Sequence, residues 1–317
     1  MSAGFSDQTL ERLLGRHDFS IELLSGGVSC DTAKITWRNE LSDGQDHGAV
    51  VKRALAQLRV PGRWEADVDR ILAEADAIEL FRRITPRNVP NLISRSDEDL
   101  AIALELAPDD MKDWRFSMLD GLIEPEVGRT LGEVLALWHT KTRGQELPER
   151  IVDGKKRLFD LRAGAFYGGM AKTWPQYGSL IRELSDELMD SRECAVHGDF
   201  SPKNILHGPS GTWVLDFEVT HQGAPVFDLA YMAAHLNLKA IKLAANREAV
   251  GETLQNFLDA YQRHGGNLPS NLSAHAGVIT AVRVVGISQV NYLDDAGKLE
   301  AIARAEALLN GAPVTIP

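Results

Sequence analysis

The spacing of apolar residues changes once along this chain of 317 residues, and that change limits its possible folds more than any other feature. Over residues 19–106 apolar and polar positions mostly alternate, which predicts short strands, with one helix over 71–81. After residue 108 apolar residues recur at helical spacing, interrupted only by two short strands over 204–207 and 213–217. We therefore predict an α+β fold with two lobes. A small antiparallel-sheet lobe, residues 1–107, is followed by a larger, mainly helical lobe, residues 108–317.

Composition and charge exclude several classes of partner. The net charge is −11 and no stretch is dense in Lys or Arg, so no nucleic-acid partner is expected. The acidic balance also disfavours anionic membrane surfaces and mildly favours neutral or cationic ligands. Cys30 and Cys194 lie far apart without a CxxC pair, and no secretory or membrane-spanning segment is visible. We expect a cytoplasmic protein without membrane contact; the sequence gives no indication of its oligomeric state.

The segment HGDFSPKN, residues 197–204, carries side chains suited to phosphoryl transfer. Asp199 is followed five positions later by Asn204, and Asp216 stands at the end of the next predicted strand. Phosphoryl transfer needs a carboxylate that orients and deprotonates the attacking hydroxyl, and oxygen ligands for the magnesium that bridges the nucleotide phosphates. The spacing therefore predicts Asp199 as the catalytic residue, with Asn204 and Asp216 as ligands of Mg2+.

The N-terminal lobe carries a matching set of nucleotide-binding candidates. A glycine-containing loop between two predicted strands would let backbone N–H groups approach phosphate oxygens. The candidates in this loop are Ser25, Gly26, Gly27 and Ser29. Lys52 ends the third predicted strand, and Glu74 on the following helix could pair with it and position it. We predict that these residues bind the phosphates of ATP.

Several segments resemble the aminoglycoside phosphotransferase and choline kinase superfamily, which has a protein-kinase-like fold. The strongest are HGDFSPKNIL, VLDFE and GAPVFDLAYM, and the resemblance extends over residues 24–238 with LSGGVSCDT, AVVK, LAEADAIELF, ALELAP and LALWH. It implies that the backbone of a hinge over 105–107, with Glu105 and Ala107, faces adenine. It also implies that Asp228 braces the catalytic loop. Ala224 stands where the family usually has an acidic residue, and Glu218 follows Phe217 where a glycine could be expected.

Some residues have two readings on sequence alone. His197 suggests a base, but a role in bracing the loop is favoured. Lys203 could contact the γ-phosphate or pair with a carboxylate, and Glu218 could bind substrate or structure its loop. Asp294 and Asp295 could face a cationic substrate, although a solvated helix end is favoured.

Taken together, these features predict a kinase that uses ATP and Mg2+ to phosphorylate a hydroxyl group of a small molecule. Acceptors in the superfamily include aminoglycosides, choline, ethanolamine and sugars such as methylthioribose, and the resemblance does not choose among them. A catalytically inactive nucleotide-binding protein is the first alternative. A protein-directed kinase is disfavoured, because only 12 positions separate Asp216 from Asp228 and leave no room for a long activation segment.

Overall fold

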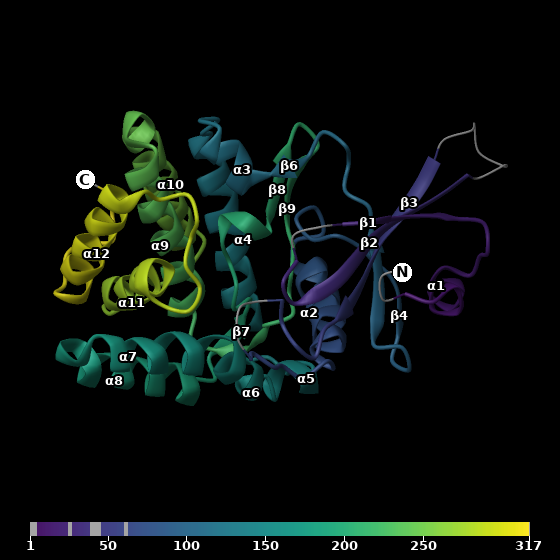
Figure 1. Ribbon diagram of the computed structural model, residues 1–317, viewed down its shortest axis with the longest axis horizontal. Helices are drawn as coiled ribbons and strands as arrows, with labels where there is room; N and C mark the ends of the chain where they lie inside the picture. The colour runs from purple at the N-terminus through teal and green to yellow at the C-terminus, as the bar shows by residue number, and fades with distance from the viewer. Residues whose placement is uncertain (1–4, 25–26, 39–45, 60–62, 317) are drawn as a thin grey trace.

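The computed structural model describes residues 5–24, 27–38, 46–59 and 63–316, and in Figure 1 its sheet and its last helices lie at opposite ends of the long axis. The sheet has five antiparallel strands in the order β1-β2-β3-β5-β4. Its strands are β1 Ser20–Leu23, β2 Cys30–Arg38, β3 Asp46–Ala54, β4 Leu92–Ser96 and β5 Ala101–Glu105. The predicted antiparallel N-terminal sheet and mainly helical remainder are thus confirmed.

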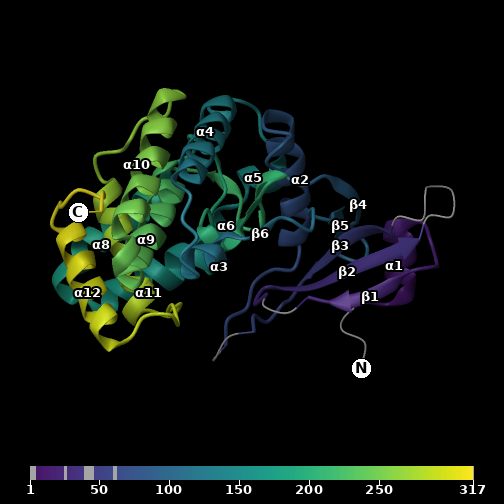
Figure 2. The same ribbon diagram turned by 90° about the horizontal axis from the view of Figure 1, so that it is seen from above.

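Helices cover both faces of this sheet, and Figure 2 shows α1 and α2 on either side of it. α2 (Arg70–Ile84) matches the predicted helix and packs Ile78 and Phe81 against one face. The other face is covered by α1 (Asp7–Leu14), which the sequence analysis did not predict and whose Leu10 packs against Val51. A helix of eight residues has only about two turns, so the helical spacing of its apolar residues is hard to distinguish from the sequence of a loop.

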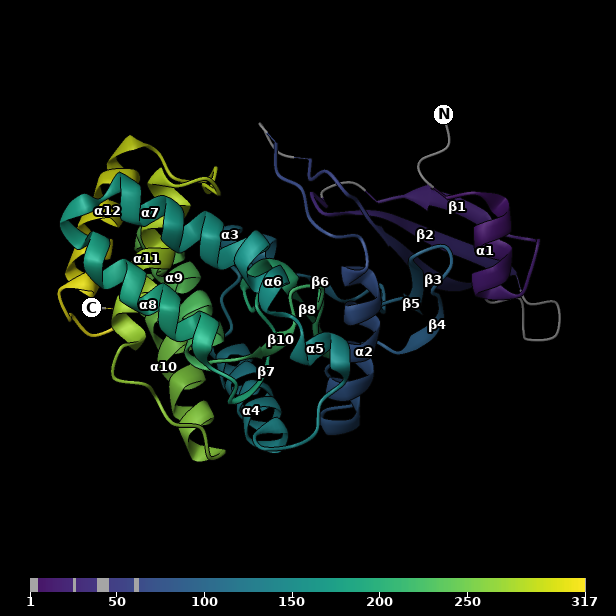
Figure 3. The same ribbon diagram turned by 90° about the horizontal axis from the view of Figure 1, so that it is seen from below.

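The remainder of the chain is mainly helical, and Figure 3 shows α7 and α8 lying across it. Its longer helices are α3 Trp114–Leu119, α4 Pro125–Thr142, α8 Gly178–Asp190, α9 Val226–Lys242, α10 Arg247–Arg263, α11 Leu272–Val285 and α12 Asp295–Leu309. Shorter ones are α5 Glu149–Val152, α6 Lys155–Leu158, a π-helix Phe159–Gly168, α7 Gly169–Thr173 and 3-10 turns Pro175–Tyr177, Pro202–Asn204 and Ala244–Asn246. Small strands complete it: β6 Lys112–Asp113, β7 Cys194–Val196, β8 Ile205–Gly208, β9 Gly211–Val214 and β10 His221–Gly223.

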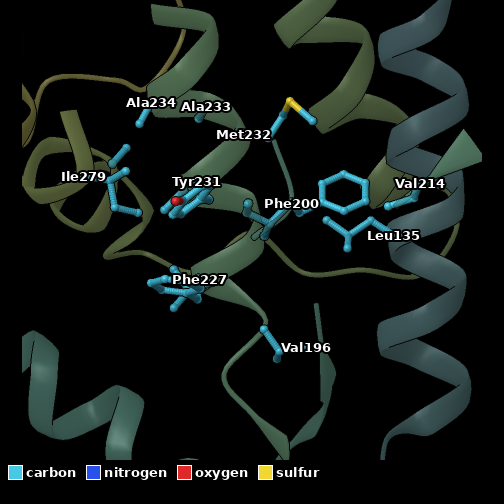
Figure 4. Packing of buried hydrophobic residues seen from close by; sticks show 14 of the residues in the cluster. Leu135, Val196, Phe200, Val214, Phe227, Tyr231, Met232, Ala233, Ala234 and Ile279 are labelled. Atoms are coloured by element: carbon cyan, nitrogen blue, oxygen red, sulfur yellow. The ribbon is translucent and has the colours of Figure 1, made fainter. Parts of the chain in front are cut away.

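The core of the helical part is built around α9, which is buried on nearly all sides. Figure 4 shows this packing, with Tyr231 of α9 near Ile279 of α11. α4, which begins at Pro125, packs closely on α10. The contact depends on a missing side chain, because a Cβ on Gly132 would lie 2.1 Å from the carbonyl oxygen of Phe257.

Trp138 of α4 joins the helical part to α2. Its ring is fully buried and stacks on Phe81 with ring centroids 4.2 Å apart. Its indole N–H donates a hydrogen bond of 2.8 Å to the hydroxyl of Thr85. Trp138 also contacts His197 and Phe200, so it fixes how α2, and with it Glu74, sits against the loop over 197–204. Within the described residues no helix is long and apolar enough to cross a membrane.

Candidate active site

A cleft of about 950 Å³ opens between the sheet and the helical part. Its lining includes most of the residues that the sequence singles out: Gly27, Ser29, Lys52, Glu74, Glu105, Ala107, Asp199, Asn204 and Asp216. Ser25 and Gly26 lie outside the described residues. Segments that are up to about 190 positions apart therefore meet in one cleft.

Lys52 on β3 lies between two carboxylates. Its Nζ is 2.5 Å from Oε1 of Glu74 on α2 and 3.0 Å from Oδ1 of Asp216. Burial opposes the charge on Lys52, but Asp216 and Glu74 together raise its pKa well above the ordinary value. Burial raises the pKa of Glu74 to about 7 against the attraction of Lys52. Lys52 is therefore a fixed cation that α2 positions from one side.

Asp216 is held in an unusual backbone conformation. The predicted strand over 213–217 ends earlier, because β9 stops at Val214 and Asp216 has a φ of 68°. The left-handed region is strained for a side chain other than glycine, and such strain is typical of functional sites. The turn leaves the Asp216 carboxylate facing the cleft beside Lys52, which lowers its pKa although burial opposes the charge.

Asp199 lies in a cage of donors at the base of the cleft. Its Oδ2 is 2.7 Å from Nζ of Lys203 and accepts a hydrogen bond of 2.9 Å from Nδ2 of Asn204. Its Oδ1 is 3.0 Å from Nη2 of Arg162, which also donates to the carbonyl of Gly198. Burial would keep Asp199 protonated, but Arg162 and Lys203 lower its pKa well below the usual range. Asp199 is thus ionised and can accept a hydrogen bond or a proton. Of the two roles considered for Lys203, the structure shows the pairing with a carboxylate.

A buried carboxylate on α9 supports the catalytic loop from behind. Asp228 accepts hydrogen bonds of 2.8 Å from the backbone N–H groups of both His197 and Gly198. Its Oδ2 is also 3.2 Å from Nε2 of His139. Gly198 has a φ of 81°, and a Cβ there would lie 2.7 Å from the carbonyl oxygen of Val219. Asp228 therefore fixes a turn that only glycine fits well.

His197 is occupied by the loop itself. Its Nδ1 accepts the backbone N–H of Asp199 at 3.1 Å, so Nε2 carries the proton and donates to the carbonyl of Leu215, also at 3.1 Å. Burial lowers its pKa. These contacts match the loop-bracing reading and leave no free nitrogen to act as a base.

Glu218, whose role was open, forms a buried ion pair. Its Oε2 lies 2.9 Å from Nε of the fully buried Arg70 at the start of α2. Nη2 of the same Arg70 guanidinium donates to the carbonyl oxygens of Ser29 and Leu55 at 2.6 and 2.8 Å. Cys30 lies 3.6 Å from the same carboxylate, and burial raises the pKa of its thiol well above the ordinary value. Glu218 therefore structures its loop, and the buried, protonated thiol of Cys30 is a poor nucleophile.

Two oxygen-bearing side chains suit a divalent cation in this cleft. Asn204 and Asp216 both face it, and Asp216 is ionised. Within the described residues no three His, Cys, Asp or Glu side chains form a metal cluster of their own. This donor set is typical of Mg2+, which takes one or two protein oxygens together with phosphate oxygens and water.

Three buried basic residues that line the cleft were not predicted from the sequence. Arg162, Lys239 and Arg283 all line it and are at least nine-tenths buried. A usable signal was present, because each is a lone cation in an apolar helical stretch, as Arg283 is in AGVITAVRVVGI. Asp294, by contrast, caps α12 by accepting the N–H of Gly297, as the helix-end reading implies.

The chain is similar in sequence to known phosphotransferases. Residues 20–274 match the phosphotransferase enzyme family. A methylthioribose kinase from Bacillus cereus (strain AH187) is 24% identical over 319 aligned residues, covering 84% of this chain and 80% of that protein. A second, from Bacillus mycoides (strain KBAB4), is 26% identical over 241 residues, covering 67% and 60%.

Two solved structures share the fold. Amicoumacin kinase hAmiN, in complex with AMP-PNP, Ca2+ and Ami, has a TM-score of 0.55 at 13% identity, covering 94% of this chain and 91% of that one. Choline kinase LicA from Streptococcus pneumoniae has a TM-score of 0.54 at 14% identity, covering 96% and 98%. The kinase-like fold is thus confirmed. Because the family match spans most of its length, the chain belongs to the phosphotransferase enzyme family.

Proposed function

We propose that this protein is a kinase that transfers the γ-phosphoryl group of ATP to a hydroxyl group of a small molecule, with Mg2+. The observation that carries the proposal is the meeting of Lys52, Asp216 and Asp199 in one cleft, each ionised and each held by a buried partner. Residues 1–107 would bind the nucleotide, and residues 108–317 would supply the catalytic loop and the acceptor pocket.

Each residue has a separate task in this proposal. Gly27 and Ser29 approach the phosphates, the hinge residues Glu105 and Ala107 face adenine, and Lys52 holds the phosphates under the control of Glu74. Asn204 and Asp216 would hold Mg2+, which when bound neutralises charge on the β- and γ-phosphates. Asp199 accepts a hydrogen bond from the acceptor hydroxyl, orients it and takes its proton.

A small acceptor fits this chain better than a protein. β10 starts five positions after Asp216 and pairs with β7 beneath the catalytic loop, so the short segment before Asp228 is built into the core. The family name and the methylthioribose kinase relatives favour a small hydroxyl compound as well. An inactive nucleotide-binding protein has no support in the site, since Lys52, Asp199 and Asp216 are all present.

Release of ADP with a panel of hydroxyl compounds tests the proposal. Asp199→Asn should lower kcat by about 10²- to 10⁴-fold, the usual contribution of a general base, and leave ATP binding nearly unchanged. Asp186→Asn, at an exposed position on α8, is the matched control and should behave as the wild type. Wild-type turnover by Asp199→Asn would refute the assignment of Asp199. Absence of transfer to every compound would refute the proposed activity.

A further inference from the structure

The end of the cleft beyond Asp199 forms a pocket that we call the cationic subsite. It is lined by Arg115 of α3, His235 and Lys239 of α9, Arg283 of α11 and Tyr292 of the following connection. α9 contacts both α3 and α11, and the three helices lie near one another in Figures 2 and 3. α9 and α11 lie in the half of the molecule away from β3, the strand that carries Lys52, and α3 lies between them and the sheet in Figure 1.

Several polar atoms of this subsite lack hydrogen-bond partners within the described part of the chain. Lys239 is only 1% exposed, yet it forms no ion pair there, and its ammonium group lies 5.4 Å from the centre of the Tyr292 ring. Among the residues that the structure describes, Arg283 bonds only to uncharged oxygens, those of Tyr231 and Ser288. Among the same residues, Nε of Arg283, Nε2 of His235 and the hydroxyl of Tyr292 are buried without any hydrogen-bond partner.

Charge in this pocket is not balanced by the carboxylates nearby. Asp199 already faces two cations, Arg162 and Lys203. Asp113 pairs with Arg115 at 2.7 Å, but Nε of Arg115 is buried without a partner. Lys239 and Arg283 therefore add positive charge that no described acid neutralises through a direct ion pair. Buried cations without a counterion are unfavourable, and a bound anion would remove that penalty.

The acid–base state of Lys239 agrees with this geometry. Burial, followed by the nearby Arg115, lowers its pKa to about 7, while Asp113 acts in the opposite direction and Arg283 adds to the lowering. Burial, together with Arg283 and Lys239, also lowers the pKa of His235 well below its usual value. An anion between these groups would favour the charged form of Lys239.

Resting on the function proposed above, we propose that the phosphate acceptor is a hydroxyl compound bearing a carboxylate or phosphate group, which Lys239, Arg283 and Arg115 bind beside Asp199. The neutral His235 and the hydroxyl of Tyr292 supply further hydrogen bonds. The whole-chain charge of −11 favoured neutral or cationic ligands, but that charge is spread over the chain whereas the subsite has the opposite sign. Substrates such as choline, which carry a fixed positive charge, are disfavoured here.

Matched pairs of compounds test this inference on the full-length protein. D-glycerate is compared with glycerol, and D-ribose 5-phosphate with D-ribose, so that the two pairs separate a carboxylate from a phosphate. Choline and kanamycin represent cationic acceptors. Binding is measured by calorimetry in the presence of ADP and Mg2+, and transfer is measured by ADP release with ATP.

We expect at least one anion to bind about 10- to 100-fold more tightly than its neutral partner, as hydrogen bonds to charged groups imply. Lys239→Met should abolish that preference and leave the KM for ATP within about 3-fold, because the apolar stem still fills the helix packing. Arg115→Gln is a second, less buried change and should weaken the same binding. Lys242→Met, at an exposed position on the same helix, is the control and should change nothing.

The outcomes separate this inference from the proposed function. Binding of neither anion, equal binding of choline, or unchanged anion binding in both Lys239→Met and Arg115→Gln would overturn the inference. A large rise in the KM for ATP in Lys239→Met would assign the subsite to the nucleotide and also overturn it. Transfer to neutral acceptors without an anion preference refutes the inference alone. Anion binding without transfer to any compound refutes the proposed kinase activity and leaves the subsite standing.

Discussion

Replacement of Asp228 by asparagine tests how the catalytic loop is held. The change keeps the size of the side chain but turns one carboxylate oxygen into an NH2 group. Oδ1 accepts the N–H of Gly198, and Oδ2 accepts the N–H of His197 and contacts Nε2 of His139. Whichever way the amide is turned, its NH2 faces at least one N–H donor that it cannot satisfy.

The size of the effect follows from these contacts. A hydrogen bond to a charged group contributes about 1.5–3 kcal/mol, and an unsatisfied buried donor costs about 1–3 kcal/mol. In the variant one hydrogen bond from a backbone N–H group is lost and that N–H is left without an acceptor. The remaining contacts of the side chain no longer involve a negative charge. We therefore expect Asp228→Asn to lower the free energy of unfolding by about 3–5 kcal/mol, as for other broken buried charge pairs.

Urea unfolding followed by circular dichroism measures this loss, with Asp186→Asn as the exposed control, expected within about 0.5 kcal/mol of the wild type. Because Asp228 positions the loop without lining the cleft, kcat should fall by about 10- to 100-fold while the KM for ATP hardly changes. A loss of stability below about 1 kcal/mol, or an unchanged kcat, would refute this account of the loop.

Three further results are expected. Asp216→Ala should weaken Mg2+-dependent nucleotide binding by at least about 10-fold, measured by titration with Mg2+ and ADP, and equal affinity in the variant would contradict its role. Gly132→Ala should destabilise the protein by about 1–3 kcal/mol through the 2.1 Å clash with Phe257, whereas Gly169→Ala, with no neighbour within 4 Å, should not. The pKa values of Asp199, Asp216 and Asp228 are lowered by folding, so their stabilisation is complete above about pH 4 and is lost as the pH falls further, which acid titration of the unfolding free energy should show.

The sequence predicted well which residues line the cleft on the side of the sheet and the loop over 197–204, because the signals for these residues are local. Asp199 and Asn204 share one loop, and strand and helix periodicity places Lys52 and Glu74 on neighbouring elements. Each of these signals spans only a few positions. It depends on the spacing of residues within one loop, strand or helix and on the pairing of opposite charges. The resemblance to a known superfamily then ordered these local signals into one site.

The acceptor side could not be predicted in the same way, because it forms only when distant elements pack together. Arg162 lies 37 positions before Asp199, and Arg283 lies 84 positions after it, yet both reach its surroundings. The ion pair between Arg70 and Glu218 joins residues 148 positions apart. A single Arg or Lys in an apolar stretch is expected to be buried, but its neighbours in the sequence do not indicate which carboxylate it will contact in the fold.

The positive surroundings of Asp199 also bear on what it can do as a base. Arg162 and Lys203 lower its pKa well below the usual range, so its affinity for a proton at neutral pH is low. In the loose transition state of phosphoryl transfer the acceptor oxygen keeps its proton until bond formation is advanced, and orientation contributes more than proton affinity. A weak base in a fixed position is therefore compatible with this chemistry. The same cations lie close to where the acceptor would bind, so the groups that hold Asp199 ionised also make its surroundings favourable to an acceptor of negative charge.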